Sequence, residues 1–336
     1  MAEASRTAGH QAEATMRGVV YGRYGGAEAL ELRELPVPGI GRRECLVKVA
    51  AVSVNPADWK LLAGDWRWAT GRRFPRRIGI DFSGTVERGG SAVETFRQGQ
   101  EVMGSVAALR TGSLAEYVAV PEAALSRKPA NVGLAEAAGI PVACAAAYLG
   151  LRHRRQDLRG TKVLVTGAGG GVGHFVLQLG KAFGAELTAV CSAGKAKLCR
   201  ELGAARVIDY ALTDPLSLNE RFDVVFDCAL SIPFSRAASI LVPGGEYLLL
   251  ATHGNVGPFF RSLLGQMVPG RKRRRTWTFL VGPNGRRLSE LAGLFERHAL
   301  RVVAPSRYPL ERASEAFRES IEGHATGKVL ITLGCG

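Results

Sequence analysis

The sequence lacks the features that would assign it to a membrane, secreted or repeat class. No apolar run reaches the ~18–20 residues that a membrane-spanning helix needs. Residues 1–15 have no apolar core of the kind found in a signal peptide, and we expect them to form a flexible, polar extension. The 336-residue chain shows no internal repeat, heptad pattern or low-complexity tract. We therefore expect a cytoplasmic protein without a transmembrane segment.

Cysteine is present, but its spacing does not fit a metal site or a disulfide framework. The six cysteines are scattered without CxxC spacing or accompanying histidines, and most lie in apolar runs. Free thiols in such runs behave as small hydrophobic groups. We expect neither a disulfide nor a zinc knuckle from Cys45, Cys144, Cys191, Cys199, Cys228 and Cys335.

Acidic residues are too few to balance the basic ones. The chain has 30 Asp and Glu against 44 Lys and Arg, a net charge of +14, with clusters at Arg72–Arg77, Arg152–Arg159 and Arg271–Arg275. Such clusters attract polyanions such as nucleic acid or an acidic membrane surface. The alternative is solvated loop charge, which we favour because no nucleic-acid recognition fold accompanies the clusters. We expect no specific nucleic-acid partner and leave weak association with an acidic surface open.

The length and the changing pattern along the chain predict two domains. A chain of 336 residues exceeds what one hydrophobic core usually supports. Residues 17–125 consist of short strand-like runs separated by glycine, proline and polar turns, and residues 132–153 are alanine-rich and helical. From Lys162 onward strands and helices alternate, which predicts an α/β arrangement with a parallel sheet covered by helices.

A glycine-rich turn in residues 162–183 is the most specific motif. An apolar run ends in Ala168-x-Gly170-x-x-Gly173 and is followed by helical spacing, which is the context of a dinucleotide-binding fingerprint. Gly170 would let the backbone approach a pyrophosphate, and Gly173 would let helix and strand pack closely. The alternative is a glycine-rich connection that binds nothing. The candidate cofactor contacts in this turn are Ala168, Gly170, Gly171, Val172 and Gly173.

Several segments in a fixed order resemble one family. Together they resemble the zinc-free quinone oxidoreductases and enone reductases of the medium-chain dehydrogenase/reductase superfamily, and most of all the chloroplast-envelope quinone oxidoreductase homologues. The resemblance runs from about Arg17 to the C-terminus. Its segments are SVNPADWK (53–60), GIDFSGTVERGGSAVETFRQGQEVMG (79–104), GSLAEYVAVPE (112–122), the glycine-rich turn, GAARVIDY (203–210), VPGG (242–245) and EGHATGKVLITL (322–333).

The resemblance implies a Rossmann domain, with a doubly wound parallel sheet, inserted into a GroES-like β-rich domain. We expect residues 16–138 and 285–336 to form the GroES-like substrate domain and residues 139–284 to form the Rossmann NADPH-binding domain. The last predicted strand, Val329–Leu333, comes too late in the chain for the nucleotide-binding sheet and agrees with this division. The active site would lie between the two domains.

The resemblance also implies a reaction without zinc. Zinc-dependent relatives supply cysteine and histidine ligands where this chain reads Val54-Asn55-Pro56 and Gly79-Ile80-Asp81. A catalytic zinc site needs three such ligands and an open position. We therefore expect no metal.

The residues after the second Rossmann strand favour NADPH over NADH. An NAD-preferring site places Asp or Glu there, whereas this chain has Ser192 and Lys195, which suit a 2′-phosphate. Tyr210 matches a phosphate-contacting tyrosine of the family. The alternative is that Lys195 and Lys197 form the solvated face of a helix.

Three residues of the NPADWK segment are catalytic candidates. The resemblance places Asn55, Asp58 and Lys60 beside the nicotinamide, where Lys60 would stabilise negative charge on a substrate oxygen. Asn55 before a proline could instead cap an Asx-type turn, and a lysine on a loop is usually solvated, although Trp59 suggests a partly buried segment. We assign no catalytic histidine. His174, which follows the fingerprint, faces either phosphate or solvent.

These observations lead to an enzyme hypothesis with open alternatives. We expect an NADPH-dependent reductase of quinones or of the activated C=C of α,β-unsaturated carbonyls. The alternatives are a pathway-specific enoyl reductase of secondary metabolism and an RNA-associated or structural protein with incidental turnover. We also expect a homodimer, because Trp277–Val281 is an apolar strand-like run late in the Rossmann domain whose exposed edge would need a partner.

Overall fold

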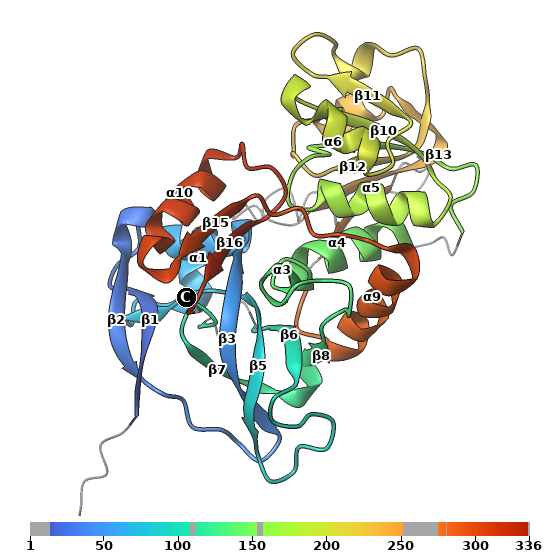
Figure 1. Cartoon of the computed structure of the whole chain (residues 1–336). Helices are drawn as coiled ribbons and strands as arrows, with labels where there is room; N and C mark the ends of the chain where they lie inside the picture. The colour runs from blue at the N-terminus through green and yellow to red at the C-terminus, as the bar shows by residue number, and fades with distance from the viewer. Residues whose placement is uncertain (1–13, 108–111, 153–156, 251–274, 280, 335–336) are drawn as a thin grey trace, which may run out of the picture.

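The computed structural model describes residues 14–107, 112–152, 157–250, 275–279 and 281–334. Two β-rich sheets lie at one end of the molecule and a parallel sheet with its helices at the other (Figure 1). Most of the N-terminal extension and the basic residues 271–274 lie outside the described residues.

A small antiparallel sheet begins the chain. Its strands are β1 (Thr15–Tyr21), β2 (Leu30–Pro36) and β4 (Arg76–Arg77), in the order β2-β1-β4. Strand β1 pairs with β2 along its whole length. It begins at Thr15, inside the segment for which the sequence predicted an extension.

The second β-rich sheet combines the N-terminal half with the end of the chain. Its order is β15-β16-β3-β5-β6-β8, and β7 pairs with β3. Strand β16 runs antiparallel to β3, with Val329 opposite Val54, so the C-terminal strand returns to the N-terminal sheet (Figure 1). The strands are β3 (Glu44–Val54), β5 (Asp81–Gly89), β6 (Glu101–Ser105), β7 (Tyr117–Pro121), β8 (Leu125–Arg127), β15 (Ser306–Pro309) and β16 (Val329–Thr332).

The third sheet is parallel and has the order β11-β10-β9-β12-β13-β14. The direction of winding reverses between β9 and β12, which is where such sheets bind ligands. Apolar side chains such as Val163, Val165 and Phe226 are fully buried along these strands. The strands are β9 (Lys162–Thr166), β10 (Glu186–Cys191), β11 (Arg206–Asp209), β12 (Phe222–Asp227), β13 (Leu241–Leu250) and β14 (Arg275–Phe279).

Helices cover the parallel sheet and join it to the β-rich part. One core contains Cys144 of α4, Leu177 of α5 and Phe295 of α9. Helix α7 is short, and β13 begins at Leu241 soon after it. The helices are α1 (Pro56–Ala63), α2 (Arg67–Thr70), α3 (Leu134–Ala137), α4 (Pro141–Arg152), α5 (Gly173–Ala182), α6 (Ala196–Glu201), α7 (Phe234–Ala237), α9 (Gly285–His298) and α10 (Ala313–Glu322). Short 3₁₀ turns lie at Ala27–Ala29, Glu122–Ala124, Ala193–Lys195, Pro215–Ser217 and Leu310–Arg312.

The predicted fold class is confirmed: a Rossmann-like parallel sheet accompanies a GroES-like β-rich part. The exact domain boundaries stay a prediction. Helix α9 belongs by sequence to the C-terminal part assigned to the substrate domain, yet its side chains share a core with α4 and α5.

The structure bears on the expectations that the cysteines form no disulfide and that the chain has no transmembrane segment. Cys45, Cys144, Cys191, Cys199 and Cys228 are free thiols, and all but Cys228 are buried. Burial raises the pKa of Cys45 to about 11 and that of Cys199 to about 12. Among the described residues, no helix is both long and apolar enough to cross a membrane.

Candidate active site

The glycine-rich turn connects β9 to α5 at the reversal point of the parallel sheet. Gly167 has a φ of +56°, which favours glycine, and starts the turn. A Cβ on Gly173 would lie 2.3 Å from the carbonyl oxygen of Gly167, so only glycine fits where α5 meets the turn. This geometry supports the packing role that the fingerprint assigns to its last glycine.

The turn presents backbone donors at the start of α5. The Gly170 N–H donates to the Gly167 oxygen at 2.9 Å, whereas the N–H groups of Gly171 and Val172 have no backbone acceptor among the described residues. Donors near a helix N-terminus attract anions through their partial charge and the helix dipole. The loop after β12 lies alongside, because a Cβ on Gly167 would be 3.2 Å from the Ala229 nitrogen.

The His174 side chain is hydrogen-bonded to the backbone of this turn. Its ring is fully buried, and Nδ1 lies 2.9 Å from the Gly170 carbonyl oxygen, so Nδ1 carries the hydrogen and donates. Burial lowers the pKa of His174 to about 3, and the ring is neutral at ordinary pH. The interpretation that His174 faces solvent is therefore wrong, since its ring is buried and its Nδ1 is bonded to the turn's own backbone.

The candidate 2′-phosphate contacts follow two adjacent strands. Strands β10 and β11 pair in parallel with Cys191 opposite Asp209, so Ser192 and Tyr210 leave the sheet at the same edge. Tyr210 is 57% exposed. Lys195 is half-buried, and its Nζ donates to the carbonyl oxygens of His324 at 3.0 Å and Ala325 at 2.9 Å. Burial lowers the pKa of Lys195.

The catalytic candidates lie on or before a helix, and not on the loop that the sequence suggested. Pro56 occupies the first turn of α1, which suits its fixed φ and missing N–H. Asn55 precedes it, and the Asn55 N–H donates to Asp58 Oδ2 at 2.8 Å. The helix ends at Gly64 in the left-handed conformation. The NPADWK segment thus forms the N-cap and the first part of a capped helix that extends to Ala63.

Asn55 belongs to a buried polar cluster that the sequence did not reveal. Its Nδ2 donates to Asp81 Oδ2 at 3.0 Å, and its Oδ1 accepts from Lys328 Nζ at 2.6 Å. Lys328 Nζ also donates to the Val54 oxygen at 3.2 Å, and the Val142 N–H donates to Asp81 Oδ2 at 3.2 Å. Asn55, Asp81 and Lys328 are at most 4% exposed. Both polar atoms of the Asn55 side chain are therefore engaged inside the protein.

Burial shifts the pKa of every ionisable group in this cluster. Desolvation raises the pKa of Asp58 to about 7 and that of Asp81 to about 6, and hydrogen bonds oppose both shifts. Desolvation lowers the pKa of Lys328, while Asp81 and Asp58 oppose that shift. The smaller shift of Asp81 fits its nearby ammonium and its three hydrogen-bond donors: Asn55, Ser53 and Val142.

Lys60 lies on α1 with its side chain buried. It is 4% exposed, and its Nζ lies 5.3 Å from the centroid of the half-buried Trp59 ring. Burial lowers the pKa of Lys60 to about 8, against an opposing effect of Asp65. The sequence prediction that Trp59 marks a partly buried segment is confirmed.

Asp81 and Lys328 are the site residues that sequence reasoning missed. Both lay in quoted segments, GIDFSG and EGHATGKV, but no role was assigned to either. Their only signal was a charged residue inside an otherwise apolar strand-like run.

The cluster and the glycine-rich turn meet through Lys328. A Cβ on Gly171 would lie 3.4 Å from the Gly327 oxygen and 3.5 Å from Lys328 Cδ. The Gly327 N–H donates to the Gly169 oxygen at 2.9 Å. The structure thus brings the candidate cofactor turn and the segment before α1 together at one place.

Residues near the family's zinc positions do not form a metal-ligand set. Within the described part of the chain, no group of three or more His, Cys, Asp and Glu side chains is placed to hold a metal ion. Asn55 and Ile80 offer an amide and an alkyl group where zinc relatives carry ligands.

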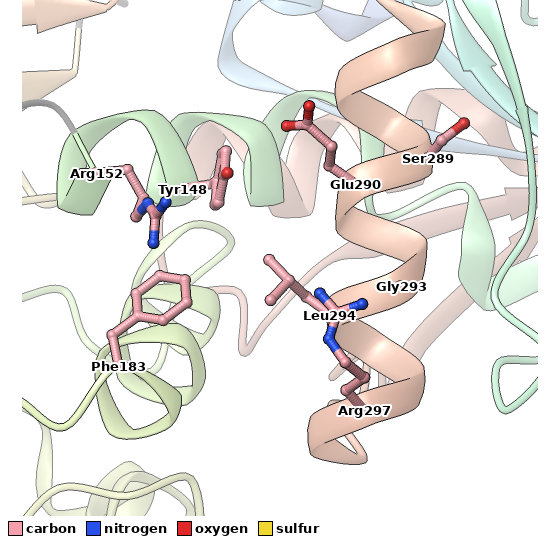
Figure 2. Close-up of a pocket in the computed structure, with 8 residues that line it drawn as sticks. All are labelled: Tyr148, Arg152, Phe183, Ser289, Glu290, Gly293, Leu294 and Arg297. Atoms are coloured by element: carbon pink, nitrogen blue, oxygen red, sulfur yellow. The ribbon is translucent and has the colours of Figure 1, made fainter. Parts of the chain in front are cut away.

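A separate cavity of about 300 Å³ lies between α4 and α9, with Tyr148 and Arg152 facing α9 across it (Figure 2). The Arg152 guanidinium lies 5.4 Å from the Phe183 ring centroid. None of the predicted site residues lines this cavity. Its lining residues are Tyr148, Arg152, Phe183, Ser289, Glu290, Gly293, Leu294 and Arg297.

Comparisons with known proteins agree with the fold. Residues 41–130 match the family model of the alcohol dehydrogenase GroES-like domain, and residues 202–331 match that of the zinc-binding dehydrogenases. A solved quinone oxidoreductase from Coxiella burnetii superposes with a TM-score of 0.85 at 26% identity, over 96% of this chain and 100% of that one. Fold and fingerprint together define a medium-chain dehydrogenase/reductase.

Comparison with curated relatives identifies the family within this superfamily. The chloroplast envelope quinone oxidoreductase homolog of Arabidopsis thaliana is 33% identical over 326 residues, covering 94% of this chain and 98% of the relative. The NADPH-dependent alkenal/one oxidoreductase of the same plant is 36% identical over 327 residues, covering 94% and 79%. The chain belongs to the quinone oxidoreductase and enone reductase family of this superfamily, and it is an oxidoreductase.

Proposed function

We propose that this protein is an NADPH-dependent, zinc-independent reductase of quinones or of the activated C=C of α,β-unsaturated carbonyls. One observation carries the proposal: the glycine-rich turn, whose N–H donors at Gly171 and Val172 have no backbone acceptor among the described residues, contacts the segment that holds Asn55 before α1. A cofactor held by its pyrophosphate on the turn would therefore lie against the segment that contacts Asn55. The names of the curated relatives support both substrate classes.

The residues after β10 and β11 support NADPH as the cofactor. Ser192, Lys195 and Tyr210 lie at one sheet edge, and no carboxylate follows β10 to repel a 2′-phosphate. A charge-assisted contact of this kind contributes ~1.5–3 kcal/mol, which corresponds to a preference of roughly ten-fold or more over NADH. The glycine-rich turn would hold the pyrophosphate.

The glycine-rich turn together with Ser192, Lys195 and Tyr210 would hold NADPH, which would supply the hydride, and solvent would supply the proton that completes the two-electron reduction. The chain's own task is to orient the substrate and to stabilise the oxygen on which negative charge develops. We assign that stabilisation to the Lys60 ammonium, whose pKa of about 8 leaves it mostly protonated at neutral pH. Asn55 and Asp58 position α1, because their hydrogen bonds are made within the protein.

The test is NADPH oxidation followed with a panel of quinones, short enones and enoyl thioesters, and repeated with NADH. We expect turnover of quinones or enones, a preference for NADPH, and unchanged rates in chelator with far less than one zinc per chain. Activity confined to enoyl thioesters would favour a pathway-specific enoyl reductase. Stoichiometric zinc whose removal abolishes turnover would overturn the mechanism.

The edge strand β14 supports a homodimer. It pairs only with β13 among the described residues, so a second copy could pair with its other edge. Light scattering at micromolar concentration checks this, and a monomer would contradict it.

A further inference from the structure

A short segment of the C-terminal region crosses the cofactor turn. Residues 323–328 run from the end of α10 to the start of β16. On the way, the Gly327 N–H donates to the Gly169 oxygen at 2.9 Å, and the Lys328 N–H donates to the Val303 oxygen at 2.8 Å. We call residues 324–328 the crossing segment. It links the Rossmann turn to the sheet that carries Asn55.

The Lys195 side chain, which follows β10, forms hydrogen bonds to the crossing segment. Its ammonium donates to the carbonyl oxygens of His324 and Ala325, at 3.0 and 2.9 Å, and these residues lie 129 and 130 positions further along the chain. An ammonium has three donors, so these two bonds leave one N–H for a phosphate oxygen. Lys195 can therefore hold the segment and the phosphate at the same time.

Gly169 gives this arrangement independent support. It occupies a position of the fingerprint where any residue is accepted. A Cβ there would lie 2.9 Å from Lys195 Cδ and 3.0 Å from Lys195 Cβ. The extra glycine thus makes room for the Lys195 stem on its way to the crossing segment.

The other end of the crossing segment reaches the catalytic helix. Lys328 Nζ donates to Asn55 Oδ1 at 2.6 Å, and Asn55 is followed directly by α1 with Lys60. A continuous series of contacts therefore joins Lys195 to α1.

We propose that Lys195 is a positioning residue as well as a phosphate contact: it holds the crossing segment on the cofactor turn and couples the 2′-phosphate to α1. That Lys195 contacts the 2′-phosphate rests on the proposed function, whereas that it holds the crossing segment in place does not. A simple phosphate contact would change only the affinity for NADPH. A fastening residue also supports turnover with NADH, which lacks the phosphate.

The first experiment is amide hydrogen exchange of the full-length, cofactor-free protein, comparing Lys195→Ala with Lys197→Ala. Lys197 is an exposed lysine two residues away and serves as the matched control. We expect the amides of residues 324–328 to exchange about tenfold faster in Lys195→Ala, because two charge-assisted hydrogen bonds are lost, and to be unchanged in Lys197→Ala. Gly169→Ala, which keeps the ammonium but displaces its stem, should show the same increase. Equal exchange in Lys195→Ala and Lys197→Ala overturns the proposal.

The second experiment measures kcat and KM of the two lysine variants with NADPH and with NADH. We expect Lys195→Ala to raise KM for NADPH and also to lower kcat with both cofactors by about threefold to tenfold, while Lys197→Ala matches the parent protein. A Lys195→Ala variant that changes only the NADPH KM overturns the coupling. If the parent protein turns over no quinone or enone with either cofactor, the proposed function fails, and the exchange experiment still decides whether Lys195 fastens the segment.

Discussion

The cofactor turn and the polar cluster beside α1 lie next to each other and are built in opposite ways. The turn consists of backbone: glycines at 167, 170 and 173 set its path, and its N–H groups at 171 and 172 have no backbone acceptor in the part of the chain that the structure describes. The cluster consists of side chains, with Asn55 hydrogen-bonded to both Asp81 and Lys328 away from solvent. The turn offers donors to a charged ligand, whereas the cluster makes its hydrogen bonds within the protein and leaves Asp58 Oδ1 and Asp81 Oδ1 without a partner among the described residues.

The difference shows in the electrostatics of the two regions. The turn carries only partial charges, which gain from an incoming phosphate. The cluster buries two carboxyl groups and an ammonium, and desolvation raises the pKa of both carboxyls. Buried clusters of this kind add little net stability, but removing one of their members strongly destabilises the protein. We infer that the cluster serves to fix the position of α1 relative to the turn.

Removing Lys328 should produce the largest effect. Lys328→Met leaves Asn55 Oδ1 and Asp81 without their ammonium partner in a buried site, which typically destabilises a protein by ~3–5 kcal/mol. Urea unfolding measures this loss. The exposed Lys197 provides a control, since Lys197→Met should change stability by less than about 0.5 kcal/mol. A loss below about 1 kcal/mol for Lys328→Met would show that the ammonium is not a partner of the cluster.

The catalytic role proposed for Lys60 predicts the next largest effect. Lys60→Ala should lower kcat and kcat/KM together by roughly 10²-fold, or ~2.7 kcal/mol, because a donor to the developing oxyanion is lost. Cofactor affinity should barely change. Steady-state kinetics with a quinone and an enone, together with cofactor binding, provide the measurement.

Lys60→Arg sharpens the same test. The guanidinium keeps the charge but presents it in a planar fork of different reach, so only part of the rate should return. Loss of NADPH binding in Lys60→Ala would make the residue a cofactor contact. Unchanged kinetics in Lys60→Ala would leave it a buried structural lysine.

The two regions also differ in how far the sequence predicts them. The turn was predictable because its residues are consecutive and each glycine answers a local steric requirement, as the 2.3 Å approach to Gly173 shows. The fold was predictable for a related reason, since alternating strands and helices predict a parallel sheet. Local patterns therefore predicted the part of the site that is made of backbone.

The cluster was not predictable from local patterns. Asn55, Asp81 and Lys328 meet only because β3 pairs with both β5 and β16, and those pairings join distant parts of the chain. The helical state of Lys60 was missed because α1 has only eight residues and begins at Pro56 directly after Asn55, a pair that also fits a turn. The partners of Lys195 lie 129 and 130 residues away and carry no sequence signal, since they are backbone carbonyls.

A methyl group at the turn should have a smaller effect than the loss of Lys60. Gly173→Ala places a Cβ 2.3 Å from the Gly167 oxygen, and we expect a loss of stability of ~1–3 kcal/mol and weaker NADPH binding. Gly194→Ala is the matched control, because nothing lies within 4 Å of its added Cβ. Urea unfolding and cofactor titration measure both variants. Equal behaviour of the two variants would contradict the steric requirement at Gly173.

The smallest effect concerns His174 beneath the turn. The unfolded chain binds a proton near the usual pKa of 6.5, whereas the folded protein does so only near 3, so stability contributed by the neutral ring falls as pH drops through this window. His174→Asn keeps a side-chain N–H donor for Gly170 but does not titrate. From pH 6.5 to 5, the free energy of unfolding should fall by about 2 kcal/mol more in the parent protein than in this variant. Asp58 and Asp81, whose raised pKa values act in the opposite direction, are present in both proteins and cancel in the difference. A difference that stays flat with pH would show that the folded protein protonates His174 as readily as the unfolded chain does.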